Sequence, residues 1–290
     1  GSALATSLVP EEKAASAIAI MFSGLAVALI TGVPLGMFIG QHFGWRMTFL
    51  VVASLGVLAF LGSLFFIPKN IAHAPSASIA KQLAVLHQPR LVMVYAMTAL
   101  GYGGTFLAFT YLVSILQTIS GFSMNAVNWI VLIYGISTAV GNIWGGRLAD
   151  KLGPIHALQI IFAILAMVLL AFTFAAPYPW LALAVVVCWG AVAFGNVPGL
   201  QVYVVKQAER FTPEAVDVAS GLNIAAFNLG IAGGAWAGGL IVAHFGLIHT
   251  AWVGALVVLL ALVLTTWSGR LDRAAGIDLK AKPLTAMAAH

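Results

Sequence analysis

Seven uncharged polar side chains stand in long apolar stretches of this sequence, where they could hold a solute by hydrogen bonds. They are tyrosines, asparagines and one glutamine: Tyr102, Tyr111, Asn142, Asn196, Gln201, Asn223 and Asn228. Their hydroxyls and amides can both donate and accept hydrogen bonds. Asn196 and Gln201 flank Pro198, which bends a helix and frees a backbone carbonyl. The pattern predicts contacts with a polar solute in a central cavity, and hydrogen bonds between helices are the alternative use of the same residues.

Residue sets for enzyme chemistry are missing from the same stretches. The sequence has no paired acids, histidine cluster or Ser/His/Asp set there, and no phosphate-binding Gly-x-x-x-x-Gly-Lys loop. The single cysteine, Cys188, leaves no disulfide or thiolate metal site within one chain. We therefore expect no enzyme activity, no catalytic residue, no metal and no cofactor. Because no Asp or Glu falls within any expected span, the chain also offers no proton carrier.

The composition shows that lipid must surround the elements holding these side chains. Apolar residues make up 62% of the 290 residues and charged residues 7%, against about 45–50% and about 25% in soluble domains. Disordered chains are polar and charged, so disorder is excluded. The 13 basic residues are spread along the chain and form no nucleic-acid patch. The class that remains is a polytopic membrane protein.

Stretches without charge set the number of helices. Residues 91–146, 152–205 and 218–269 carry no charged residue, and 14–68 carry only Arg46. One crossing needs about 20 apolar residues, so each stretch fits two helices and a short turn. We predict an all-α protein with eight transmembrane helices, at residues 14–43, 47–67, 90–117, 125–148, 155–175, 180–205, 217–244 and 248–268.

The charged residues also predict the orientation of these helices. Every pair of helices starts and ends on the same side, and Arg46 is the one basic residue expected on the other. Positive residues concentrate in cytoplasmic loops. We therefore expect the charged loops and the C-terminus in the cytoplasm.

Two further motifs could control movement between helices. The first places glycines at four-residue spacing beside a proline: Gly24, Gly32, Pro34, Gly36 and Gly40. Such a face allows close helix approach in lipid, and the proline bends the helix. The second is a charged cluster, expected just after a helix end, that could hold a cytoplasmic gate by ion pairs or be a solvated loop: Gly146, Arg147, Asp150, Lys151 and Gly153.

The two ends of the chain resemble each other. Gly32, Gly36, His42-Phe43-Gly44 and Thr48 recur 202 positions later as Gly234, Gly238, His244-Phe245-Gly246 and Thr250. Both copies run from the inside to the outside, so the repeat is parallel, as in the two halves of some transporters. Glycines at four-residue spacing in both copies favour a paired role at the interface between halves. The two histidines are expected to cap outer helix ends.

The stretch from Gly24 to Gly40 resembles the glycine-proline motif of the fifth helix in drug:proton antiporters of the major facilitator superfamily. Residues 146–153 are similar to that family's cytoplasmic loop between helices eight and nine, and the nearest likeness is to the sugar and arabinose efflux branch. By this resemblance the chain corresponds to helices five to twelve, so we expect the first four helices to be missing. Residues 1–68 would end the N-terminal half, 69–89 would be the cytoplasmic loop between halves, 90–268 the C-terminal half and 269–290 a cytoplasmic tail.

The resemblance implies a secondary active transporter in the inner membrane. It would export a small sugar-like or drug-like solute by alternating access, and the full-length protein would be proton-coupled. The expected partners are the lipid bilayer, the solute and the proton, with no nucleic acid. The alternative is a truncated membrane scaffold that transports nothing, or a gene remnant.

Overall fold

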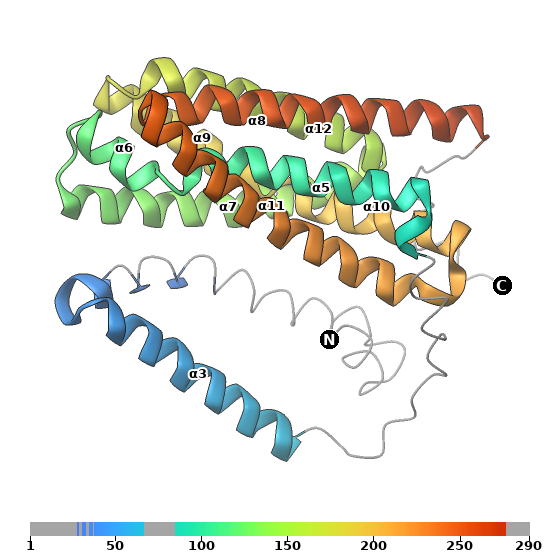
Figure 1. The fold of residues 1–290 in the computed structure, drawn as a ribbon, viewed down its shortest axis with the longest axis horizontal. Coiled ribbons are helices and arrows are strands. Elements are labelled where there is room, and N and C mark those ends of the chain that lie inside the picture. The colour runs from blue at the N-terminus through green and yellow to red at the C-terminus, as the bar shows by residue number, and fades with distance from the viewer. Residues whose placement is uncertain (1–27, 29–30, 33–34, 37, 67–84, 277–290) are drawn as a thin grey trace. The chain divides into compact units, whose positions relative to one another are not determined.

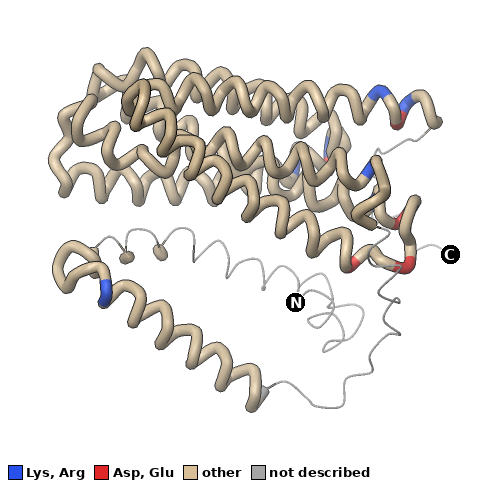
Figure 2. The backbone as a smooth tube through the Cα atoms, viewed as in Figure 1, with Lys and Arg blue, Asp and Glu red and all other residues tan. Residues whose placement is uncertain are grey.

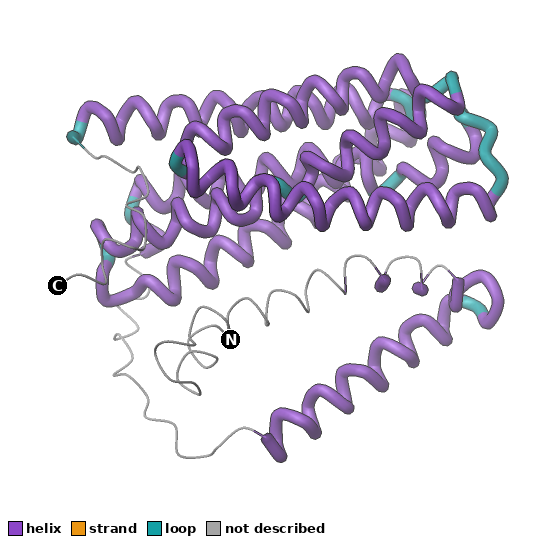
Figure 3. The backbone as a smooth tube through the Cα atoms, turned by 180° about the vertical axis from the view of Figure 1, so that it is seen from behind, coloured by secondary structure: helices purple, strands orange, loops and turns teal. Residues whose placement is uncertain are grey.

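The computed structural model describes residues 28, 31–32, 35–36, 38–66 and 85–276 (Figure 1). Within these residues it contains helices and short loops, and no strand (Figure 3). The elements are α3 (Trp45–Phe66), α5 (Pro89–Phe109), α6 (Leu112–Thr118), α7 (Met124–Leu152), α8 (Pro154–Ala175), α9 (Pro179–Ala193), α10 (Asn196–Phe211), η2 (Pro213–Ala215), α11 (Val216–Phe245) and α12 (His249–Ala274).

Seven helical segments of the described chain are long and apolar enough to cross a membrane. They overlap the seven expected spans from 47–67 onward, and the segments that end at Leu152 and Phe211 extend beyond the expected ends at 148 and 205. The remaining expected span, 14–43, lies mostly outside the described residues, so the count of eight helices stays a prediction. α12 ends at Ala274, beyond the expected end at residue 268, so the start of the expected tail is helical.

The chain forms two compact units. The first contains α3 together with residues 128–136 of α7, and the second contains the other described helices from α5 to α12. In the second unit α5 packs against both α11 and α12, and α8 packs against α12, α9 and α10. The described charged residues of this unit gather at one end of its helices (Figure 2). The turns that lack charge lie at the other end.

Glycine brings α11 unusually close to α5. Gly230, Gly234 and Gly238 are buried at four-residue spacing on one face of α11. A Cβ on any of them would overlap a carbonyl oxygen of α5, that of Ala99, Gly103 or Leu107 respectively. Such small-residue faces let helix backbones touch in lipid. This glycine face of α11 therefore packs against α5 inside the second unit. The sequence had favoured a role for it at the interface between halves.

Glycine also brings α5 close to α12, and α7 close to the α9–α10 segment. Gly104 of α5 and Gly254 of α12 face each other, and a Cβ on either would meet the other's carbonyl oxygen. On α7, a Cβ on Gly145 would overlap the carbonyl oxygen of Gly195, and a Cβ on Gly141 would overlap that of Ala191. These contacts place the helices of the unit so closely that side chains at the contacts are excluded.

One membrane segment of the second unit is broken in its middle. α9 ends at Ala193 and α10 begins at Asn196, with Phe194 and Gly195 between them. In a regular helix the residue four positions after Phe194 would donate its N–H to the Phe194 carbonyl, but that residue is Pro198, which has no N–H. The N–H of Val197 donates to the Phe194 carbonyl instead, at 3.2 Å. Pro198 therefore explains the break, as the sequence indicated.

The two turns of the predicted repeat have the same local structure. The Nδ1 atoms of His42 and His244 lie 2.9 Å and 2.8 Å from the carbonyl oxygen four residues earlier. Gly44 and Gly246 follow with φ of 83° and 95°, a region that favours glycine. In both turns the third residue after the glycine donates its N–H to the glycine carbonyl, at 3.1 Å and 3.3 Å. Both histidines therefore cap their helix ends, as predicted.

The glycine contact between α11 and α5 gives a matched test. We expect Gly234→Ala to lower the melting temperature, because its Cβ would overlap the Gly103 carbonyl; overpacking of this kind costs about 1–3 kcal/mol. Gly233→Ala is the control, since a Cβ there meets nothing within 4 Å. Thermal unfolding of the purified protein in nanodiscs measures both. Equal melting of the two variants would contradict the close approach.

Candidate functional site

Two of the residues predicted to face a solute, Gln201 and Asn223, form a hydrogen-bonded network. Thr98 of α5 donates to Asn223 Oδ1 on α11 at 2.6 Å, and Asn223 Nδ2 donates to Gln201 Oε1 on α10 at 3.1 Å. Gln201 Nε2 then donates to Ser220 Oγ. The network joins three helices, and Asn223 is 4% exposed. For these two residues the structure therefore has the helix-to-helix bonds that were the alternative interpretation.

Asn196 is buried differently, at the start of α10 beside the break. Asn196 is 0% exposed, and among the residues that the structure describes neither its Oδ1 nor its Nδ2 has a hydrogen-bond partner. Gly101 of α5 lies next to it, where an added Cβ would be 3.7 Å from Asn196 Nδ2. Leaving a buried polar group without a partner costs about 1–3 kcal/mol. The site thus offers one free donor group and one free acceptor inside the unit.

Aromatic rings lie beside this break. The Tyr102 ring is buried and packs edge-on against Phe194, at 5.9 Å between centroids, and against Phe227 of α11, at 4.0 Å. Phe194 is one of the two residues between α9 and α10. The predicted residue Tyr102 therefore belongs to the same region as Asn196.

The three remaining predicted residues lie apart from this region. Tyr111 follows the end of α5, and its hydroxyl donates to the Ala235 carbonyl of α11 at 3.1 Å. Asn228 is exposed, and its Nδ2 donates to a carbonyl of its own helix at 2.9 Å. Asn142 is half-buried on α7. The structure does not bring all seven residues into one cluster.

The predicted gate motif occupies the last turns of α7. Arg147, Asp150 and Lys151 are exposed, and among the described residues none of their side chains has a hydrogen bond or ion pair. Asp150 lies inside α7, which continues to Leu152, so its expected position just after the helix end was wrong. Gly153 ends the helix with φ of 82°, and Gly146 packs against Pro198, 3.7 Å from an added Cβ.

The predicted glycine-proline motif lies in the first unit and is described in part. Gly24 and Pro34 lie outside the described residues. Gly36 and Gly40 are half-buried, and Thr48 Oγ1 donates to the Gly36 carbonyl at 3.2 Å. Gly32 is exposed, and a Cβ there would meet nothing within 4 Å.

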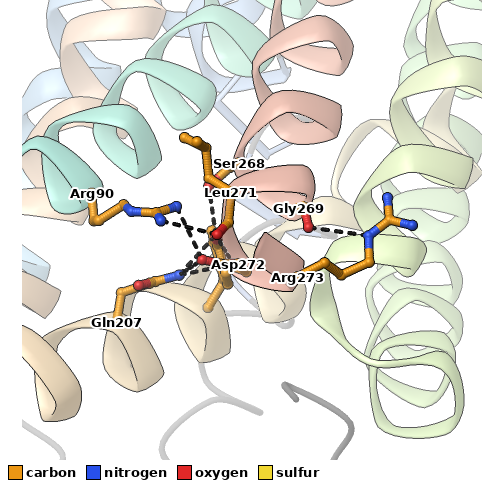
Figure 4. A network of polar contacts seen from close by, with 8 residues as sticks. Arg90, Gln207, Ser268, Gly269, Leu271, Asp272 and Arg273 are labelled. Atoms are coloured by element: carbon orange, nitrogen blue, oxygen red, sulfur yellow. Dashed lines mark hydrogen bonds and ion pairs between the residues drawn. The ribbon is translucent and has the colours of Figure 1, made fainter. Parts of the chain in front are cut away.

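A buried charged cluster was missed by the sequence analysis (Figure 4). Asp272 on α12 is 2% exposed, and Arg90 in the first turn of α5 pairs with it at 3.2 Å. From α10, the Tyr203 hydroxyl donates to Asp272 Oδ2 at 2.6 Å and Gln207 Nε2 donates to both carboxylate oxygens at 3.0–3.1 Å. Asp272 lies four residues beyond the expected span 248–268, on a helix that continues to Ala274.

A spacing signal for this cluster is present in the sequence. Ser268 and Asp272 are four residues apart, as are Tyr203 and Gln207, and residues at this spacing share a helix face. The Tyr203 hydroxyl gives its one proton to Asp272, so Ser268, 2.6 Å away, must donate to the tyrosine oxygen. Which helices meet there could only come from the tertiary structure.

Metal-binding groups and the cysteine add no site to the described part of the chain. No group of three or more His, Cys, Asp or Glu side chains there is placed to hold a metal ion. Cys188 is exposed on α9. The chemistry that these residues offer is therefore hydrogen bonding and proton exchange.

Comparisons with known proteins point to one family. Residues 1–210 match the model of the Major Facilitator Superfamily. The chain is 50% identical over 273 residues to the "Uncharacterized MFS-type transporter YtbD" of Bacillus subtilis, covering 94% of this chain and 69% of that protein. It is 39% identical over 271 residues to the "Inner membrane transport protein YdhP" of Escherichia coli K12, covering 93% and 68%. It is 29% identical over 266 residues to a "Probable sugar efflux transporter" of Pasteurella multocida, covering 91% and 64%.

Two asparagines on α11 test the hydrogen-bond network. We expect Asn223→Ala to lower stability by about 0.6–2 kcal/mol, the range for hydrogen bonds between membrane helices. Asn228→Ala is the control of the same residue type, and we expect no change because that amide is exposed and bonded within its own helix. Thermal unfolding in nanodiscs separates the two. A drop as large for Asn228→Ala would show that the network is not what stabilises the unit.

Proposed function

Because the chain belongs to the major facilitator superfamily, we propose that it exports a small, polar, sugar-like or drug-like solute across the membrane by alternating access, with proton coupling in the full-length protein. The observation that carries this proposal is the Asn196 amide, which is buried at a broken membrane helix and has no hydrogen-bond partner in the described part of the chain. A bound solute would supply the missing hydrogen bonds.

The surroundings of Asn196 favour a solute with hydroxyl groups. The amide has both a donor and an acceptor, as a hydroxyl does. We propose that the rings of Tyr102 and Phe194, which contact each other beside the same break, supply the apolar walls. Binding sites commonly combine apolar walls with a few polar groups in this way. One relative, at 29% identity, is named as a sugar efflux transporter, which supports the same class of solute.

Alternating access is supported by the break between α9 and α10. Broken helices in transporters lie at substrate sites, where their ends can move separately. The break lacks regular backbone hydrogen bonds at Phe194 and Gly195. We propose that α10 moves relative to α9 about this point when the solute binds.

The predicted motifs keep a place in this proposal. We propose that exposed Arg147, Asp150 and Lys151 form ion pairs that hold the cytoplasmic gate, and that Gly36 and Gly40 provide a contact surface in the other half. The proposed division of the chain remains 1–68, 69–89, 90–268 and 269–290. A scaffold or gene remnant is not favoured, because the relatives at 50% and 39% identity are named as transporters.

We propose an inner-membrane location with the charged end of the second unit in the cytoplasm. The described charges of that unit gather at one end of its helices (Figure 2), and positive charge favours the cytoplasmic side.

Replacing the Asn196 amide should separate transport from stability. We expect Asn196→Leu to leave the melting temperature unchanged or raised, since it removes two unpaired polar atoms without changing the shape much. Solute transport should fall about tenfold or more, the equivalent of losing about 1.4 kcal/mol of binding. Proteoliposomes with an imposed pH gradient, tested with sugars, nucleosides and cationic drugs, measure it. The control is Asn125→Leu, an exposed position at the start of α7.

Two outcomes would contradict the role of Asn196. Transport at the wild-type rate by Asn196→Leu would show that the amide does not bind the solute. A large fall in its melting temperature would show that the amide already has a structural partner.

Single cysteines test the orientation in a Cys188→Ser background. We expect Asn125→Cys, at the uncharged end, to react with a membrane-impermeant maleimide in intact cells. Glu209→Cys, exposed near the end of α10, should react only after the cells are opened. The opposite pattern would reverse the proposed orientation.

A further inference from the structure

We propose that the last turns of α12 and the start of α8 bind the headgroup of an anionic phospholipid from the surrounding bilayer. The side chains that carry the proposal are Trp267, Arg270 and Arg273 of α12, with His156 in the first turn of α8 and Lys151 in the last turn of α7. This site is separate from the proposed solute site, and the inference does not depend on which solute is moved.

The last turns of α12 lie against the start of α8. Gln159 Nε2 of α8 donates to Thr266 Oγ1 of α12 at 3.4 Å, and a Cβ on Gly269 would be 2.7 Å from Ile155 Cγ2. Arg273 lies four residues after Gly269, on the same helix face, and its Nε donates to the Gly269 carbonyl at 3.3 Å. The guanidinium group is therefore held at the edge of the contact between the two helices.

The exposed side of α12 changes from apolar to basic near the end of the helix. Its exposed residues follow one another at three- or four-residue spacing: Leu256, Leu260, Val263, Trp267 and Arg270. Residues at this spacing share one face. Tryptophan is typical of the headgroup level of a membrane, and Trp267 is 54% exposed. A phospholipid has the same order of groups, from acyl chain to charged headgroup, so one molecule lying along this face would meet matching side chains.

Basic side chains outnumber acidic ones where α7 and α12 end. Arg147, Lys151, Arg270 and Arg273 are exposed there, together with the acid Asp150. Within the described part of the chain, the Arg270 side chain makes no hydrogen bond or ion pair. Its charge is therefore available to an anion from the membrane.

The other acid of this region does not neutralise the exposed arginines. Asp272 is buried and pairs with Arg90 of α5 at 3.2 Å. Figure 4 shows Arg273 turned away from Asp272, although the two residues are adjacent in sequence. The carboxylate therefore balances Arg90 inside the unit, and the positive charge of Arg270 and Arg273 remains on the outside.

The chemistry of these groups favours a phosphate. A guanidinium group presents a planar set of N–H donors that matches the oxygens of a phosphate, and Arg270 and Arg273 are neighbours on the helix surface. The exposed imidazole of His156 has a ring N–H that can donate as well. Basic pockets between membrane helices bind anionic lipid headgroups in this way.

A matched basic residue at the same end of the unit has different surroundings. Arg210 is exposed in the last turn of α10 and has no partner among the described residues. Three exposed acids lie near it in sequence: Glu209, Glu214 and Asp217. Figure 2 shows acidic residues at this turn between α10 and α11. An anion is therefore disfavoured at Arg210, which makes that position a control.

Native mass spectrometry of the purified protein in detergent tests the lipid site. The protein is titrated with phosphatidylglycerol and with phosphatidylcholine, and the two association constants of the first bound lipid give a preference ratio. We expect the wild type to prefer phosphatidylglycerol and Arg270→Gln to lower the ratio about fivefold, which corresponds to about 1 kcal/mol for one basic side chain near an anionic surface. Arg270→Gln combined with Arg273→Gln should lower it about 25-fold.

The control and two outcomes decide the proposal. Arg210→Gln removes the same charge at the same end of the unit and should keep the wild-type ratio. An equal fall in Arg210→Gln, or a wild-type ratio in Arg270→Gln, would overturn the lipid site. If the double variant does not fold, the single variant decides, because Arg270 has no described partner to lose.

A competition experiment separates a lipid from a free anion. Excess inorganic phosphate should leave phosphatidylglycerol bound, because the exposed apolar face of α12 also contacts the acyl chains in the proposed complex. Displacement of the lipid by phosphate would overturn the assignment to a lipid. Because no solute is present in either experiment, a protein that binds the lipid but moves no solute would contradict the proposed function alone.

Discussion

The contact between α5 and its two neighbours, α11 and α12, is the constraint on which the second unit depends. Lipid provides no hydrophobic force between helices, so packing must come from close approach. Gly103 and Gly104, adjacent on α5, serve the two contacts, one toward Gly234 and the other toward Gly254. Because these contacts join backbone to backbone, they leave no space for side chains to adjust. The middle of α5 is therefore held by backbone contacts on two sides.

The polar side chains divide according to whether their hydrogen bonds are complete. Thr98, Gln201 and Asn223 bond to one another between helices and account for their own burial. Asn196 is fully buried, and its side-chain amide has no hydrogen-bond partner within the described ranges. Such an amide does not stabilise the unit, since an apolar residue of the same shape would avoid the cost of removing the amide from water. That difference is the reason Asn196, among the predicted polar residues, carries the proposed solute site.

The cluster around Asp272 holds helices together by charged and polar groups, whereas the glycine contacts hold them by backbone packing. A buried ion pair stabilises little when its desolvation is counted, but removing one partner is costly. Arg90 and Asp272 form such a pair, 3.2 Å apart. Its position at the first turn of α5 and near the end of α12 places it where the glycine contacts no longer fix the helices.

The sequence by itself determined the class of protein and the helix positions. Long, uncharged apolar stretches predict membrane helices, because lipid requires bonded backbone groups and a helix bonds them within itself. The repeat of His42-Phe43-Gly44 as His244-Phe245-Gly246 predicted two turns of the same local structure, since a turn depends on neighbouring residues. Asp272 was missed because the apolar pattern ends before α12 does, and the helix continues on contacts with Arg90 and Gln207 that lie far away in sequence. Only the tertiary structure decided which polar groups found partners, because that depends on which helix faces meet.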